Sequence, residues 1–264
     1  MRNLSVLLEK EWLEYQRQRG LLFSSLAVPL LLTVIAIGVM IGGNVAPSAG
    51  DNEEVARQLM QINPALAGMP LEDAAQAVMG QTFSTMFLLI PLILPSIIAS
   101  YCVVGEKLNR TLEPLLATPV ETWELLAGKM LAALIPSMVL TWACGGLYIA
   151  SVWLSARSPR VFAAVVSPGW LTVFLACTPL LALIAIAVMV AVSSRVNDPR
   201  TAQQFSAWVV VPFLGVFFGQ LTGVLVLSPL VALVAAGVLA LVAGLAVWGA
   251  SRIFQREAIL TRWT

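Results

Sequence analysis

The feature that most constrains this chain is the distribution of its ionisable side chains. Within its 264 residues, five stretches contain no Asp, Glu, Lys or Arg: 20–50, 74–105, 130–156, 161–194 and 201–251. A helix needs roughly 20 predominantly apolar residues to cross a lipid bilayer. The first four stretches each accommodate one such helix, and the fifth accommodates two, separated at Ser228-Pro229. The chain is therefore predicted to be an all-α membrane protein with six transmembrane helices.

Composition excludes a soluble fold. Hydrophobic residues make up 59% of the chain and charged residues only 11%, and a soluble protein of this length would not keep that much apolar surface from water. The apolar stretches do not alternate in polarity, so transmembrane strands are not expected either. The three cysteines are an odd number within or beside predicted spans, and they give no disulfide framework.

The predicted orientation follows from the positions of Lys and Arg. With the N-terminus in the cytoplasm, only Arg57, Arg157 and Arg160 lie outside. Twelve basic residues then lie inside: Arg2, Lys10, Arg17, Arg19, Lys107, Arg110, Lys129, Arg195, Arg200, Arg252, Arg256 and Arg262. Because basic residues accumulate on the cytoplasmic side, both termini are predicted to be inside, with Arg157 and Arg160 touching outer-leaflet phosphates. An aromatic belt is expected near helix ends, at Trp123, Trp153, Trp170, Trp208 and Trp248.

The spans define one membrane domain with short flanking segments. Residues 1–19 are predicted to form an interfacial amphipathic helix, with a disordered basic tail as the alternative, because apolar residues recur at helical spacing: Leu4, Leu7, Leu8, Trp12 and Tyr15. Residues 20–251 form the transmembrane domain, with spans at about 21–43, 82–104, 127–153, 169–193, 205–226 and 229–250. Its loops are an outer loop 44–80, with short helices at 51–62 and 71–80, a cytoplasmic loop 105–123 and an inner loop 195–204. A cytoplasmic tail, 252–264, ends the chain.

Several kinds of chemistry are excluded by missing residues. The chain has no histidine, so Ser-His-Asp and Cys-His arrangements and histidine-containing metal sites are impossible. The phosphate-binding pattern is absent, since Gly128-Lys129 is followed by Met130 and has Trp123 at the first glycine position. No ionisable residue lies deep in a predicted span, which disfavours ion-coupled transport. We therefore predict no catalytic, cofactor or metal site, and no enzymatic activity, in this chain.

The loop between the second and third spans has the pattern of a short amphipathic helix. Leu108, Leu112, Leu115 and Leu116 share one helical face, and charges of both signs lie around it. Pro119 ends the segment before the next span begins. Such a helix suits the groove of a partner protein, although an interfacial helix that touches only lipid fits the pattern equally well.

Three segments together carry a family resemblance. Residues 105–107 read GEK and residues 110–119 read RTLEPLLATP, while residues 193–204 read SSRVNDPRTAQQ and residues 254–263 read FQREAILTRW. With the six spans and the N-terminal interfacial helix, these segments closely resemble the ABC-2 type permeases, whose architecture is that of type V exporters. These are the membrane subunits of one class of ATP-binding-cassette transporter. No nucleotide-binding domain is expected within this chain.

The resemblance implies a function and a set of partners. Two permease subunits, identical or paralogous, would pair in the cytoplasmic (inner) membrane lipid and rest on two copies of an ABC ATPase subunit, with no nucleic acid involved. ATP and Mg²⁺ would bind only in that partner, and the complex would export a drug, peptide or lipid-like substrate. The resemblance places the ATPase contacts on the coupling loop 105–123 and the inner loop, at Glu106, Arg110, Thr111, Glu113, Leu115, Leu116, Arg195 and Arg200.

A dimer face is predicted on the fifth span. Gly215, Gly219 and Gly223 are spaced by four residues, which lets helix backbones approach closely in lipid. The resembled family often places this span at the subunit interface. Packing within one chain is the alternative reading of the same glycines.

Other functions remain open alternatives. A self-sufficient channel or secondary carrier would work without ATP, whereas an ATPase-driven membrane scaffold would hydrolyse ATP in its partner and move no substrate. An intramembrane enzyme ranks last, since no catalytic pair is visible at depth. Ser84, Ser96 and Ser100 on the second span suit either a translocation path or hydrogen bonds within or between helices.

Overall fold

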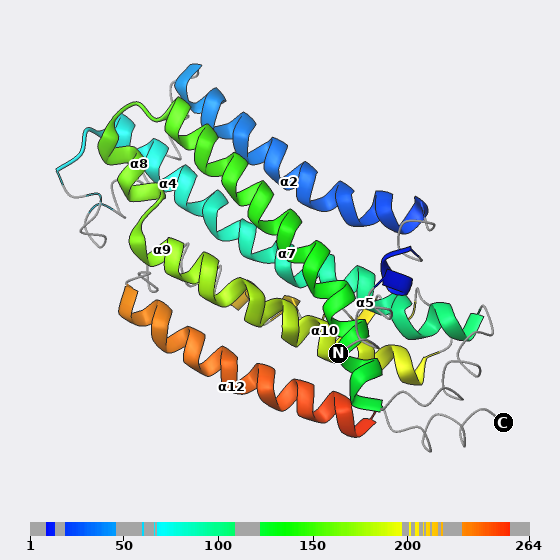
Figure 1. The fold of residues 1–264 in the computed structure, drawn as a ribbon. Coiled ribbons are helices and arrows are strands. Elements are labelled where there is room, and N and C mark those ends of the chain that lie inside the picture. Colours follow the sequence, from blue (N-terminus) through cyan, green and yellow to red (C-terminus); the bar gives the residue numbers. More distant parts are fainter. Residues whose placement is uncertain are drawn as a thin grey trace.

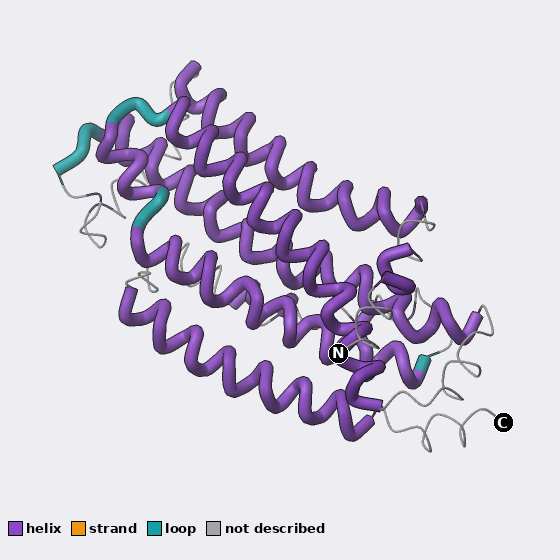
Figure 2. The backbone as a smooth tube through the Cα atoms, viewed as in Figure 1, coloured by secondary structure: helices purple, strands orange, loops and turns teal. Residues whose placement is uncertain are grey.

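The computed structural model of the chain describes residues 9–13, 19–45, 60, 66, 68–108, 122–196, 201, 204–205, 208, 210–211, 213–215, 218 and 229–253. Within these residues the regular secondary structure is helical, short turns and loops join some of the helices, and no strand occurs (Figure 2). This agrees with the all-α prediction, because a chain in lipid satisfies its backbone polar groups within each helix.

The helices run back and forth along one bundle (Figure 1). In chain order they are α2 (Arg19–Val45), α4 (Leu71–Met86), η2 (Phe87–Leu89), α5 (Ile90–Leu108), α7 (Thr122–Ser155), α8 (Pro159–Val165), α9 (Pro168–Thr172), the π-helical η3 (Val173–Cys177), α10 (Thr178–Arg195) and α12 (Pro229–Ile253). The helix α10 packs on α5, α7 and α12, and α2 packs on α7, α5 and α4. We call the end where α5 and α10 finish and α7 begins the loop end.

Five segments of the described chain are long and apolar enough to cross a membrane: Ser25–Gly42, Leu71–Tyr101, Trp123–Ser155, Pro159–Arg195 and Leu230–Ile253. They correspond to the predicted spans one to four and six. Most of the predicted fifth span, 205–226, lies outside the described residues, although each described position from Thr201 to Phe218 is helical. The helix α10 finishes at the loop end, whereas α12 starts at the opposite end (Figure 1).

The second span begins earlier than predicted. Residues 71–80 belong to α4, which continues through η2 into α5, so they are not a separate short helix of the outer loop 44–80. The other predicted piece, 51–62, lies outside the described residues apart from Met60. The acidic pair Glu72 and Asp73 occupies the first turn of α4, where negative charge complements the helix dipole. A charged first turn hid the start of this span from the hydrophobicity argument.

Prolines interrupt two of the membrane-crossing segments. The 3₁₀ turn η2 immediately precedes Ile90-Pro91, and the π-helical turn η3 precedes Thr178-Pro179. Proline has no N–H to donate to the preceding turn, so the α-helical hydrogen-bond ladder is broken at both places. An irregular turn therefore joins α4 to α5 in one segment and α9 to α10 in the other.

Close helix contacts depend on two glycines. A Cβ added at Gly80 of α4 would clash with Val165 of α8, and one added at Gly145 of α7 would clash with the ring of Phe174. The α7 backbone therefore lies directly against the Phe174 ring, which stacks on Trp170 with ring centroids 5.0 Å apart. Small residues at such crossings allow the van der Waals contact that holds helices together in lipid.

Buried polar groups in the bundle have partners. The Tyr148 hydroxyl donates to the carbonyl of Gly80 at 2.7 Å, and the Ser84 hydroxyl donates to Tyr148. The hydroxyls of Ser96 and Ser100 donate to carbonyls of their own helix, and all three serines are buried. Of the two readings of Ser84, Ser96 and Ser100, the structure supports hydrogen bonding rather than the lining of a path.

One other expectation, that of Trp170 in an aromatic belt, was wrong, and the phosphate contacts expected of Arg157 and Arg160 stay predictions. Trp170 is only 2% exposed, and its indole N–H donates to the carbonyl of Ser84, so it belongs to the core and not to an aromatic belt. Arg157 forms an ion pair with Glu72, and Ser158 donates to Asp73. The charge of Arg157 is thus paired within the protein.

Candidate functional site

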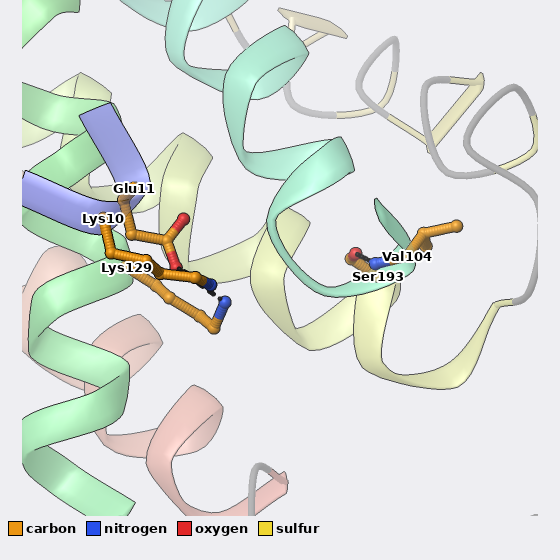
Figure 3. Close-up of polar contacts among 5 residues, drawn as sticks. All are labelled: Lys10, Glu11, Val104, Lys129 and Ser193. Atoms are coloured by element: carbon orange, nitrogen blue, oxygen red, sulfur yellow. Dashed lines mark hydrogen bonds and ion pairs between the residues drawn. The ribbon is translucent and has the colours of Figure 1, made fainter. Parts of the chain in front are cut away.

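The two ends of the segment 109–121 are held at the loop end of the bundle. It is flanked in sequence by Leu108, the last residue of α5, and by Thr122, the first residue of α7. The helix α10 also ends here, at Arg195, and the helical residues 9–13 lie at the same end (Figures 1 and 3). Sequence positions more than 100 residues apart therefore meet around the predicted coupling loop.

A buried ion pair fixes the α7 side of this segment. The Lys129 ammonium lies 3.1 Å from a carboxylate oxygen of Glu11, and the side chain of Lys129 is 1% exposed (Figure 3). Lys10 approaches the same oxygen at 3.3 Å and is 31% exposed. The pair joins the N-terminal helical segment to the second turn of α7, seven residues beyond Thr122.

The charges around Glu11 stabilise its ionised form. Burial by itself would raise the pKa of Glu11, but the ammonium groups of Lys129 and Lys10 and their hydrogen bonds outweigh burial and hold the pKa below its usual value of 4.5. A buried charge that lost its partner would be strongly unfavourable. The N-terminal segment and α7 therefore have a specific mutual position.

A hydroxyl contact fixes the α5 side. The Ser193 hydroxyl of α10 donates to the carbonyl of Ser100 at 3.0 Å. It also accepts from the amide of Val104 at 3.2 Å, the contact drawn in Figure 3. Ser193 is fully buried. The contact therefore ties the last two turns of α5 to the last turn of α10, immediately before the two predicted loops.

The structure describes only part of the predicted ATPase-contact set. Arg195 is exposed in the last turn of α10, at the loop end, and Glu106 lies in the last turn of α5, where only the backbone is described. The remaining members lie outside the described residues: Arg110, Thr111, Glu113, Leu115, Leu116 and Arg200. Glu106 and Arg195 thus lie on helices that pack together at this end, and the other assignments stay predictions.

The predicted dimer face is described at one position. Gly215 is exposed, and no described atom lies within 4 Å of a Cβ placed there. Gly219 and Gly223 lie outside the described residues. The alternative of packing within the chain finds no support at Gly215, and the dimer assignment stays a prediction.

Sequence reasoning missed Glu11, Lys129 and Ser193. Lys129 was counted only as one of the inner basic residues, although it stands at the edge of the charge-free stretch 130–156. A lysine so close to an apolar span is a sequence signal for a buried partner. No comparable signal exists for Ser193, since a serine next to another serine at a helix end is unremarkable in sequence.

The bundle defines a class of protein, the multi-pass membrane proteins. At its loop end, buried polar contacts hold the two helices α5 and α7 that flank the segment 109–121. The chain belongs to the ABC-2 family transporter proteins, whose family profile matches residues 5–236. This match covers most of the chain and confirms the resemblance seen in its loops. A comparison with curated proteins found no match. The family is a membrane component of ABC transporters, which work with an ATPase partner.

Proposed function

We propose that this chain is the permease subunit of an ABC exporter and that a separate ATPase subunit powers it. The observation that carries the proposal is the anchoring of both ends of the segment 109–121. One end is held by Ser193 on α10, and the other by the Lys129–Glu11 pair. A loop that receives force from a partner needs such rigid attachments, because a loose stem would absorb the movement.

The proposed mechanism assigns ATP chemistry entirely to the partner. The chain has no histidine and no phosphate-binding motif, and no cluster of metal-ligating side chains occurs among the described residues. ATP-driven closure of two ATPase subunits would push on the coupling loops of two permease subunits. Movement would then pass by two routes. The helix α5, which precedes the loop in sequence, would transmit it to α10, and the helix α7, which follows the loop, would transmit it to the N-terminal segment.

The same geometry supports an orientation with the loop end in the cytoplasm. Lys10, Lys129, Arg195 and Arg252 lie at this end, whereas Arg157 and Arg160 lie at the opposite end. This distribution follows the positive-inside rule. A drug, peptide or lipid-like substrate suits the long stretches of the sequence without Asp, Glu, Lys or Arg, and export is proposed from the family resemblance.

Affinity purification in mild detergent tests the proposal. The tagged chain is expected to retain a P-loop ATPase, identified by mass spectrometry, and the variant Glu106→Ala/Glu113→Ala is expected to lose it. The matched control Glu72→Ala/Asp73→Ala removes two carboxylates at the opposite end of the bundle and should retain the ATPase. If the chain purifies alone and moves solutes or ions in ATP-free vesicles, it is a channel or carrier instead. If the ATPase is retained and active but no substrate is moved, the chain is a scaffold.

A further inference from the structure

The Ser193 hydroxyl occupies an unusual place in α5. Ser100 and Val104 are four residues apart, so their carbonyl and amide are the two partners of a single α-helical hydrogen bond. Ser193, which comes from α10, bonds to both of them. A side-chain hydroxyl placed in a helical hydrogen-bond ladder is a recognised cause of helix bending.

Three other buried hydroxyls of the described chain donate within their own helices. Thr33, Ser137 and Thr141 donate to carbonyls four residues earlier in their own helices, at 2.6–2.7 Å. Such local bonds satisfy the hydroxyl without joining two helices. Ser193 instead accepts from one backbone group and donates to another on a neighbouring helix, which specifies the separation and register of α5 and α10.

The position of this contact connects it to the coupling loop. Val104 is followed by Gly105, which has low helix propensity, and a Cβ at Gly105 would find no described atom within 4 Å. Ser193 stands two residues before Arg195, the end of α10. The contact therefore lies directly before both predicted ATPase-contact loops: Val104 is one residue before the loop 105–123, and Ser193 is two residues before the loop 195–204.

We propose that Ser193 is a positioning residue for coupling, which makes the loop-bearing ends of α5 and α10 move as one unit. When α5 bends at the turn 100–104, the hydroxyl supplies substitute partners to the Ser100 carbonyl and the Val104 amide. The turn can then tilt without leaving these groups unpaired at membrane depth. The inference rests on the proposed function, because it assumes that an ATPase acts on these loops.

The first test uses hydrogen exchange of the full chain in detergent. In Ser193→Ala the amide of Val104 should exchange roughly fivefold faster, in keeping with the loss of one net hydrogen bond. The matched control is Ser194→Ala, because the Ser194 hydroxyl donates to the Ala191 carbonyl of its own helix. Unchanged exchange at Val104 in Ser193→Ala would overturn the contact whether or not an ATPase binds.

The second test measures movement in the purified complex with its ATPase. Spin labels are placed at Gly105→Cys and at Val196→Cys, which follows α10 and is outside the predicted ATPase-contact set, in a background whose three native cysteines are alanine. With Ser193 intact, and in the Ser194→Ala control, the distance between labels should stay a single narrow distribution with and without ATP and vanadate. In Ser193→Ala the distribution should broaden or split when nucleotide binds. Identical distributions in Ser193→Ala and wild type, or a nucleotide-dependent change in wild type, would overturn the proposal. Failure to recover any ATPase refutes the proposed function, and the coupling role with it.

Discussion

The replacement Lys129→Met tests the buried ion pair, since it removes the cation and leaves the Glu11 carboxylate buried. At 3.1 Å, and with an effective dielectric constant of about 20, the direct attraction between the two charges is about 5 kcal/mol. Desolvation offsets much of that attraction in the intact pair, but it remains as a penalty when one partner is deleted. The remaining neighbour, Lys10, is partly exposed and supplies only weak compensation. We expect a loss of about 3 kcal/mol, at the lower end of the range for breaking a buried pair.

The assay is thermal unfolding in detergent, followed by tryptophan fluorescence. For a protein of this size, a loss of about 3 kcal/mol lowers the apparent Tm by roughly 6–12 °C. The matched control is Lys10→Met, which removes the same charge from the same carboxylate at a site 31% exposed and should cost less than about 1 kcal/mol. Adding Glu11→Gln to Lys129→Met should recover part of the loss, because the uncompensated charge is removed.

The reasoning fails if Lys129→Met lowers the apparent Tm no more than Lys10→Met does. It also fails if the double variant is less stable than Lys129→Met, because the penalty would then not come from an unpaired carboxylate. Either result would mean that the N-terminal segment is not held to α7 by charge.

Three further predictions concern the same bundle. The folded-state pKa of Glu11 lies below 4.5, so the stabilisation by the ionised carboxylate is complete above about pH 4.5 and is lost as the pH falls through that lowered pKa. The Tm difference between wild type and Glu11→Gln should therefore be constant from pH 7 to 5 and shrink below pH 4.5. Gly145→Ala should destabilise the protein by about 1–3 kcal/mol in thermal unfolding, because its methyl group meets the Phe174 ring, whereas Gly146→Ala, whose Cβ meets no described atom within 4 Å, should not; equal midpoints would refute this crossing. Tyr148→Phe should cost about 1–2 kcal/mol in the same assay through the loss of its bond to the α4 backbone, and an unchanged midpoint would argue against that bond.

Local composition and pattern predicted the membrane class and much of the helical plan. Runs without charge are long enough to cross a bilayer, and lipid forces such runs to be helical, so five predicted spans overlap the membrane-crossing segments of the structure. The coupling-loop motif also pointed to the family, which the profile match confirmed. The boundaries were less certain, as α4 shows, because the charges of Glu72 and Asp73 at a helix start look like a loop in sequence.

The candidate site was only partly within reach of the sequence. The coupling motif marks the segment between α5 and α7, but nothing local indicates what anchors it. Glu11 and Lys129 are 118 residues apart, and Ser193 and Val104 are 89 apart. Such partners are chosen by the packing of whole helices, which a local pattern does not encode.

The sequence by itself thus determined that this chain is an integral membrane protein, roughly where its helices lie along the chain, and which family it belongs to. These properties follow from hydrophobic length and from a contiguous motif, both of which are local. Only the tertiary structure decided that Arg157 pairs with Glu72, that Trp170 is buried, and that Ser193 bonds to the α5 backbone. Each of these depends on the register and distance between two helices, and these are set by side-chain packing across the bundle.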